Sequence, residues 1–132
     1  MEQASQFQFR LDPSTGVPVY RQIIDQVTTA IAMGALKGGA QLPTVRQVAV
    51  DLAVNPNTVV RAYRELEIRG TLTTQQGVGT FISLEKVQPD EAERQKRLSQ
   101  LAADCAARAG AGGFSVAELI ERIRELAERS HP

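Results

Sequence analysis

The sequence is poor in the residues that usually carry metal, redox or triad chemistry. Its 132 residues include one cysteine, one histidine and no tryptophan, and aromatic residues make up only 5%. A single cysteine, Cys105, cannot form an internal disulfide, which agrees with a reducing cytoplasm. His131, the penultimate residue, belongs to no group with metal-ligand spacing and to no Ser–His–carboxylate triad. We therefore expect no metal, no cofactor and no enzymatic activity.

Net charge and long apolar runs are also missing. The 15 basic and 15 acidic residues give a formal net charge of zero. This balance argues against a general binder of polyanions and makes the local distribution of charge decisive. No apolar stretch approaches the roughly 20 residues that span a bilayer, and no basic start precedes an apolar run. Neither a membrane partner nor a signal peptide is expected.

Two short helices joined by a tight turn are predicted over residues 44–69. Thr44 is a good N-cap, and Gln47 three residues later completes a capping box. Asn55 can cap the second helix, with Pro56 at the first helical position, where its missing N–H costs nothing. The turn between the helices is very short, as a helix-turn-helix requires.

The second of these helices has an apolar and a polar face. The apolar face, expected to pack inward, consists of Val59, Ala62, Tyr63 and Leu66. The polar face consists of Asn57, Thr58, Arg61 and Arg64. Amide side chains can pair with adenine edges and arginine with guanine or phosphate, so the polar face suits the major groove of DNA.

Strands are predicted on both sides of this pair. After Gly70, which suits the position just past a helix, the β-prone segments 72–74 and 80–82 flank a turn and form a two-stranded wing. Near the N-terminus, alternation over Phe7–Leu11 predicts a half-buried strand. A further helix runs from Pro18 to Gly34, with Tyr20 on its inward face.

The motifs form an ordered set: Pro18-Val19-Tyr20-Arg21-Gln22-Ile23, Leu42-Pro43-Thr44-x-Arg46, Val54-x-x-x-Thr58-Val59 with Ala62-Tyr63 and Leu66, Gly70, and Gly77-x-Gly79-Thr80-Phe81. The set covers about half of the chain and resembles the winged-helix domain of the GntR family of bacterial transcription regulators. The Asn55-Pro56-Asn57-Thr58 segment and the short tail are most similar to the YtrA-type subfamily. The resemblance implies a mainly α fold with a small β-wing, a winged helix-turn-helix that binds double-stranded DNA.

The resemblance also implies where DNA is contacted. Some family members carry Arg where this sequence has Pro56 and Val60, so base readout is expected to rest on the amides and Arg61. The wing glycine, Gly77, is expected near the minor groove. The expected DNA-binding residues are Thr44, Arg46, Asn55, Asn57, Thr58, Arg61, Arg64, Gln76 and Gly77.

Four of these residues also have a purely structural alternative. Arg46 can pair with Asp51 or Glu65 instead of DNA. Asn55 is needed as a cap in any case, and Gly77 suits a turn without any ligand. Arg64 can be an ordinary solvated surface arginine.

A different composition begins after the wing. Residues 85–89 read as a linker, and Asp90 can cap a helix that runs to about Ala109. A break at Gly110–Gly113 precedes a second helix, which a capping box of Ser115 and Glu118 begins. We therefore expect a winged helix-turn-helix domain over residues 1–84 and an antiparallel two-helix extension over 85–132.

The extension is expected to form a homodimer, because a helix pair alone buries little apolar surface. The expected dimerisation residues are Leu98, Leu101, Cys105, Leu119, Ile120, Ile123 and Leu126. The alternative is that the pair folds back onto the winged helix. Cys105 is either a small buried apolar residue or a redox-sensitive thiol.

The expected function is a sequence-specific, cytoplasmic transcription regulator, a dimeric repressor of an inverted-repeat operator. The resemblance implies control of its own or a neighbouring transporter operon, and a small-molecule effector is possible. The alternative is a winged helix used for protein–protein contact, which an apolar recognition face would indicate. An enzyme is not expected, because too few residues follow the wing for a catalytic domain.

Overall fold

The computed structural model describes residues 7–84 and 91–129. The chain divides into two units, residues 1–85 and residues 86–132. The predicted linker over 85–89, the Asp90 cap and His131 lie outside the described residues.

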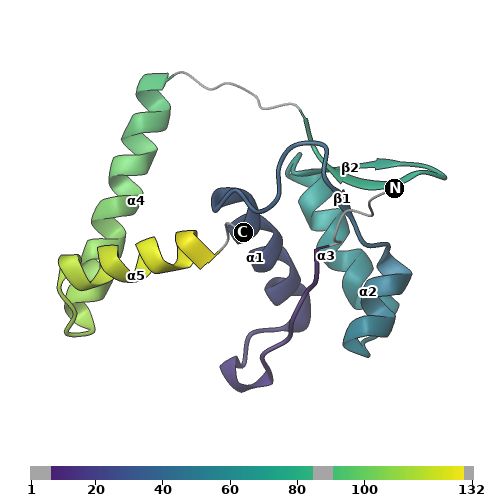
Figure 1. Cartoon of the computed structure of the whole chain (residues 1–132), viewed down its shortest axis with the longest axis horizontal. Coiled ribbons are helices and arrows are strands. Elements are labelled where there is room, and N and C mark those ends of the chain that lie inside the picture. Colours follow the sequence, from purple (N-terminus) through teal and green to yellow (C-terminus); the bar gives the residue numbers. More distant parts are fainter. Residues whose placement is uncertain (1–6, 85–90, 130–132) are drawn as a thin grey trace. The chain divides into compact units, whose positions relative to one another are not determined.

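Three helices form the body of the first unit: α1 (Val19–Ala32), α2 (Val45–Leu52) and α3 (Pro56–Ile68). A short 3-10 helix, η1 (Pro13–Thr15), precedes them. Helix α3 packs against both α1 and α2 (Figure 1). Its predicted inward face is confirmed, since all four of its residues are buried: Val59, Ala62, Tyr63 and Leu66.

The predicted caps of the helix-turn-helix are confirmed. The Thr44 hydroxyl oxygen accepts from the backbone N–H of Gln47 at 3.0 Å, and the Asn55 side-chain oxygen accepts from Asn57 at 2.8 Å. The second half of the predicted capping box is wrong. The Gln47 amide donates to Asp51 at 2.8 Å instead of reaching back to Thr44, because a residue four positions on lies on the same helix face.

The wing is confirmed and has one more strand than predicted. Strands β2 (Leu72–Gln75) and β3 (Gly79–Ile82) are antiparallel, and β1 (Gln41–Leu42) pairs with the other edge of β3. The order is therefore β1-β3-β2. Alternation of apolar and polar residues cannot reveal a strand as short as β1, which has two residues. This pairing joins the segment that leads into α2 to the wing.

The predicted strand over Phe7–Leu11 is wrong, because these residues find a helix rather than a strand beside them. The backbone of Arg10 bonds with the Gln26 side chain on α1, donating to Oε1 at 2.9 Å and accepting from Nε2 at 2.5 Å. One amide side chain offers only one donor–acceptor pair of this kind, so the hydrogen bonds cannot continue along the segment as they do between two strands. Phe9 is buried and contacts Phe7 edge to face.

The second unit is the predicted helical pair, α4 (Glu91–Ala111) and α5 (Val116–Arg129). The break was predicted to begin at Gly110, but this residue is helical. A glycine inside a helix costs only about 1 kcal/mol, so it does not end one by itself. The turn comes later, with Gly113 at φ 86° and the Phe114 N–H donating to the Ala109 carbonyl at 2.8 Å.

A capping box begins α5, as predicted. The Ser115 N–H donates to the Glu118 carboxylate at 2.9 Å, and the Glu118 N–H donates to the Ser115 hydroxyl oxygen at 3.0 Å. These bonds hold the pKa of the Glu118 carboxyl below its usual range. In Figure 1, α5 leaves the end of α4 at a steep angle instead of lying along it, and most apolar side chains of the pair stay exposed.

Candidate nucleic-acid interface

The first turn of α3 presents short polar side chains. Asn55 and Asn57 are exposed, and Thr58 is half-buried. Asn55 uses its side-chain oxygen for the cap, so the amide NH₂ is the donor that it can offer. Side chains at the start of the second helix of a helix-turn-helix reach base edges in the major groove.

A shallow hollow of about 390 Å³ continues along the exposed side of α3. It is lined by Asn57, Val60, Arg61, Arg64, Glu65 and Ile68. Amide and guanidinium donors therefore lie beside two apolar side chains, Val60 and Ile68, and one carboxylate, Glu65. Val60 occupies the position where some family members carry Arg, and an apolar side chain there can contact a thymine methyl group but cannot donate to guanine.

Arg61 is held by an aromatic ring on another helix. Its guanidinium carbon lies 3.7 Å from the ring centre of Tyr20 on α1, and the guanidinium carbon of Arg21 lies 5.9 Å from the same centre. Both distances fall within the range of cation–π attraction. Sequence reasoning placed Tyr20 on the inward face of its helix and missed this contact, because no local pattern links residues so far apart.

Arg46 lies exposed in the first turn of α2. Its predicted structural alternatives, pairing with Asp51 or Glu65, are wrong. Asp51 accepts from Gln47 at 2.8 Å, and Glu65 forms an ion pair with Arg69 at 3.3 Å. Among the described residues, the Arg46 side chain has no hydrogen-bond or ion-pair partner, so its charge is available to a ligand.

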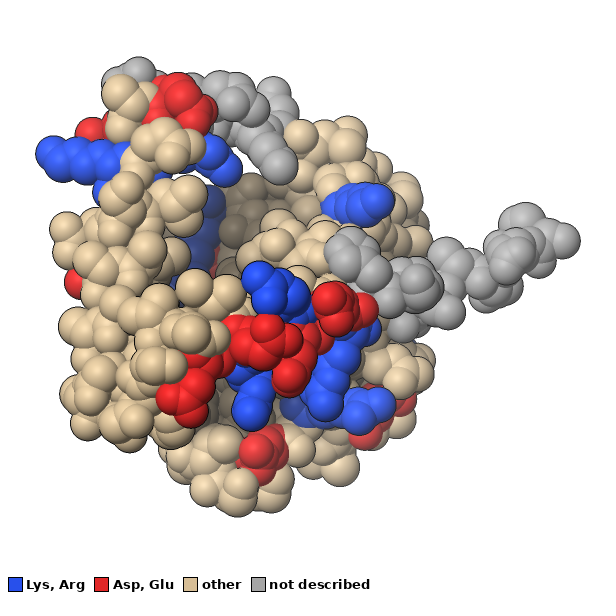
Figure 2. Space-filling view, turned by 60° about the vertical axis from the view of Figure 1, so that its left-hand side comes forward, with Lys and Arg blue, Asp and Glu red and all other residues tan. Residues whose placement is uncertain are grey.

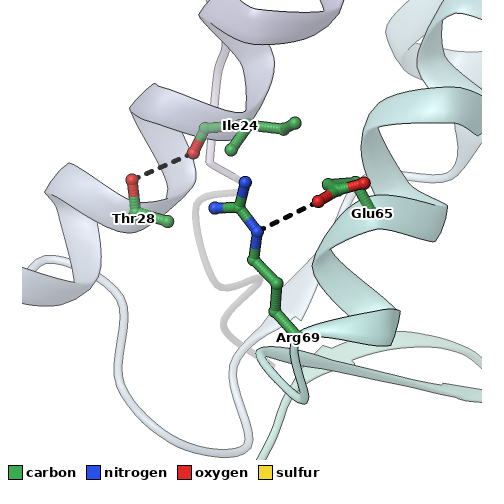
Figure 3. A network of polar contacts seen from close by, with 4 residues as sticks. All are labelled: Ile24, Thr28, Glu65 and Arg69. Atoms are coloured by element: carbon green, nitrogen blue, oxygen red, sulfur yellow. Dashed lines mark hydrogen bonds and ion pairs between the residues drawn. The ribbon is translucent and has the colours of Figure 1, made fainter.

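Arg64 and Arg69 differ in whether an acidic residue pairs with them. At the end of α3, Arg69 pairs with Glu65, and its guanidinium extends toward α1, where Ile24 lies and where Thr28 bonds back to the Ile24 carbonyl at 3.1 Å (Figure 3). Arg64 is exposed and has no such partner in the described part of the chain. Arg64 therefore keeps its place among the candidate contacts.

The wing tip carries Gln76 and Gly77, both exposed. Gly77 has φ 78°, and a Cβ placed there would meet nothing within 4 Å. Its backbone conformation therefore favours glycine, whereas crowding within the chain does not. Residues 73–80 contain no Lys or Arg, so any contact with DNA here is made by amide groups or main chain.

A buried hydroxyl connects α3 to the start of α2. Tyr63 Oη donates to the carbonyl of Pro43 at 2.6 Å, and burial raises the pKa of this phenol. The predicted core role of Tyr63 is confirmed. The residue positions the interface without being on its surface.

Other kinds of site find little support in the described ranges. Residues 7–84 and 91–129 contain no group of His, Cys, Asp or Glu side chains that could hold a metal ion. Within the same ranges, every helix is too short or too polar to cross a bilayer. On the face shown in Figure 2, acidic and basic residues are interspersed and no area of one sign dominates.

A capped second helix with a polar exposed face, packed beside a three-stranded wing, defines a winged helix-turn-helix protein. Residues 19–82 match the family described as bacterial regulatory proteins, gntR family. The chain belongs to this family, whose members are transcription regulators with a DNA-binding domain.

Three similar proteins support the assignment. The transcriptional repressor YtrA of Bacillus subtilis is 45% identical over 74 residues, which cover 56% of this chain and 57% of the repressor. The uncharacterized regulator YhcF of the same species is 33% identical over 111 residues, covering 84% of this chain and 91% of YhcF. The structure of YtrA from Sulfolobus acidocaldarius, a GntR-family transcription factor, has 33% identity and a TM-score of 0.54, covering 71% of this chain and 97% of that one.

Proposed function

We propose that the chain is a sequence-specific transcription regulator that acts in the cytoplasm as a dimeric repressor of an inverted-repeat operator. The observation that carries this proposal is the exposed face of α3, where amide and guanidinium groups stand on a capped and well-packed helix. The direction of regulation rests on similarity to a protein named as a repressor, YtrA of Bacillus subtilis.

In the proposed docking, α3 lies in the major groove with its first turn on the base edges. Asn57, Thr58 and the amide NH₂ of Asn55 read bases, since amide and hydroxyl groups match base-edge donors and acceptors. The further proposed contacts are Thr44 and Arg46 at the start of α2, Arg61 and Arg64 along α3, and Gln76 and Gly77 at the wing tip.

The proposed dimer forms through the second unit. Five of its large apolar side chains are 38–58% exposed, namely Leu98, Leu101, Ile120, Ile123 and Leu126. Cys105 and Leu119 are half-buried beside them. Apolar residues so exposed on a helix pair indicate a missing partner surface. A second copy related by a two-fold axis would cover the same surface on both chains and match the symmetry of an inverted repeat.

A small-molecule effector has a possible place where α4 meets α5. A hollow of about 470 Å³ is lined by Cys105, Arg108, Ala109, Phe114, Glu118, Leu119 and Arg122. Its apolar walls with a few charged groups suit a small ligand of mixed character. An effector bound there would touch the proposed dimer surface.

The test is selection of bound fragments from a random DNA pool with the full chain. The selected duplex is then titrated against a scrambled duplex of the same length at two salt concentrations. We expect an inverted repeat bound at least ~1,000-fold more tightly than scrambled DNA. Binding without preference, or no binding, would contradict the proposal. If an inverted repeat is selected, a search of the genes beside its genomic copies tests control of the chain's own operon or of a transporter operon.

A further inference from the structure

One ring on α1 attracts two arginines from different helices. Tyr20 has the guanidinium of Arg61 at 3.7 Å and that of Arg21 at 5.9 Å from its ring centre. The ring is half-buried and packs against the core of the winged helix, which restricts its movement. It thus offers a fixed platform for the more mobile arginine side chains.

Neither arginine is neutralised within the described residues. Arg61 has Glu65 one turn ahead, but that carboxylate pairs with Arg69 at 3.3 Å. Arg21 has Asp25 one turn ahead on α1, and no ion pair joins the two. Arg21 and Arg61 therefore lie beside one ring without an ion-pair partner in the described part of the chain, and the net charge of the whole chain is zero.

A close contact with a ring face, such as that of Arg61 at 3.7 Å, restricts the conformations of an arginine side chain. Stacking occupies the face of the guanidinium and leaves its N–H groups pointing outward in one plane. Those donors match the oxygens of a phosphate, which takes a planar, two-pronged contact. Because the ring already restricts the side chain, less conformational entropy is lost when a phosphate binds.

The position of the pair also favours a phosphate. Arg61 lies one turn beyond Asn57 and borders the same hollow on the exposed side of α3. Tyr20 and Arg21 lie in the first turn of α1, where the positive end of the helix dipole attracts anions. The pull toward Tyr20 directs Arg61 to the α1 side of α3, away from the bases that the first turn of α3 would read.

We propose that Tyr20, Arg21 and Arg61 form one phosphate-binding site for the DNA backbone that borders the groove entered by α3. Arg21 and Arg61 contact phosphate, and Tyr20 is a positioning residue that acts through Arg61. The inference rests on the proposed DNA-binding function and adds helix α1 to its contact surface. It also removes Arg61 from base readout and leaves that task to Asn55, Asn57, Thr58 and Arg64.

The test measures the affinity of the full chain for the selected duplex and for scrambled DNA over a series of salt concentrations. The variants are Arg61→Gln, Arg21→Gln, Tyr20→Phe, Tyr20→Leu and Tyr20→Leu combined with Arg61→Gln. Arg129→Gln, an exposed arginine in the last turn of α5, is the charge-matched control. Thermal melting by circular dichroism verifies that each variant is folded.

Loss of a phosphate contact has a recognisable pattern. Arg61→Gln and Arg21→Gln should each weaken binding to both duplexes alike and flatten the salt slope by about one unit. Tyr20→Phe keeps the ring face and should bind like the parent chain. Tyr20→Leu should weaken binding about two- to five-fold, the size of a cation–π contact, but have no further effect once Arg61 is gone. Arg129→Gln should change neither affinity nor slope.

Other results would overturn the inference. If Arg61→Gln weakened only the selected duplex, Arg61 would contact a base. Additive effects of Tyr20→Leu and Arg61→Gln would show that Tyr20 does not act through Arg61, and unchanged salt slopes would exclude phosphate contacts.

DNA binding by the parent chain distinguishes failure of this inference from failure of the proposed function. If it binds all DNA equally, sequence-specific regulation fails while the slopes still decide the phosphate site; if it binds no DNA, both proposals fall.

Discussion

The hydroxyl of Tyr63 donates to the carbonyl of Pro43 across 2.6 Å in the interior of the winged helix. Tyr63 belongs to α3, and Pro43 directly precedes the N-cap of α2. The bond therefore fixes the two helices of the helix-turn-helix relative to each other. A carbonyl buried at this point has no water to replace a lost donor.

Tyr63→Phe should lower the free energy of unfolding by about 1–3 kcal/mol, because the Pro43 carbonyl would lose its buried donor. Urea denaturation followed by circular dichroism measures this change. The other tyrosine supplies the control. Tyr20→Phe should be close to neutral, since the Tyr20 hydroxyl has no hydrogen bond to the described residues. Equal losses in the two variants would show that the Tyr63–Pro43 bond contributes nothing specific.

Arg46→Ala should weaken operator binding by about 1–3 kcal/mol if the guanidinium makes a bidentate base contact. If it contacts phosphate, scrambled DNA should lose affinity equally and the salt slope should fall by about one unit. Fluorescence anisotropy with labelled duplexes distinguishes the two outcomes. Arg69→Ala is the control, because Arg69 is occupied by Glu65. Unchanged binding by the Arg46 variant would refute the proposed docking of α2.

Gly77→Ala should reduce stability by about 1–2 kcal/mol, because φ 78° is unfavourable for any residue with a Cβ. Gly70→Ala should cost a similar amount, as Gly70 has φ 82° and is equally uncrowded. Only the Gly77 variant should also weaken DNA binding, since a Cβ at the wing tip would stand between the backbone and the minor groove. Matched thermal melts and titrations compare the two. Equal DNA affinities would mean that the wing tip does not approach DNA.

Ile123→Glu should convert the proposed dimer into a monomer, because a carboxylate would be placed on the exposed apolar side of α5. Sedimentation equilibrium measures the change in mass. Operator affinity should fall by about 100-fold or more, since two linked winged helices gain from binding together. Glu125→Gln, on the charged side of the same helix, should leave mass and affinity unchanged. A persistent dimer in the Ile123 variant would place the interface elsewhere.

Local signals predicted the helices and most of the wing. The caps at Thr44, Asn55 and Ser115 are readable because a cap is formed by residues two or three positions apart. Strand β1 escaped prediction because its partner strand lies far along the chain. The Phe7–Leu11 segment shows the reverse error, since the alternation was real but the neighbouring surface is a helix.

The candidate site was likewise predictable where it depends on local sequence, and not where it depends on contacts between helices. The polar face of α3 follows from helical periodicity alone, so the sequence is enough to identify Asn57, Arg61 and Arg64 as candidate contacts. Periodicity does not tell which of these arginines a neighbouring helix engages. The Tyr20–Arg61 contact emerges only when α1 and α3 are packed together. The Glu65–Arg69 pair joins residues four positions apart at the end of α3, and packing places it beside α1 (Figure 3).

Four consecutive residues, Gln41 to Thr44, serve three parts of the interface at once. Gln41 and Leu42 pair with the wing, Pro43 accepts from Tyr63 of α3, and Thr44 begins α2. The wing, α2 and α3 are thereby all connected to one short segment. A displacement of any one of these elements would strain the other two. Each winged helix of the proposed dimer is therefore expected to be rigid. A signal that releases DNA would have to change the distance between the two winged helices and not the structure within one of them.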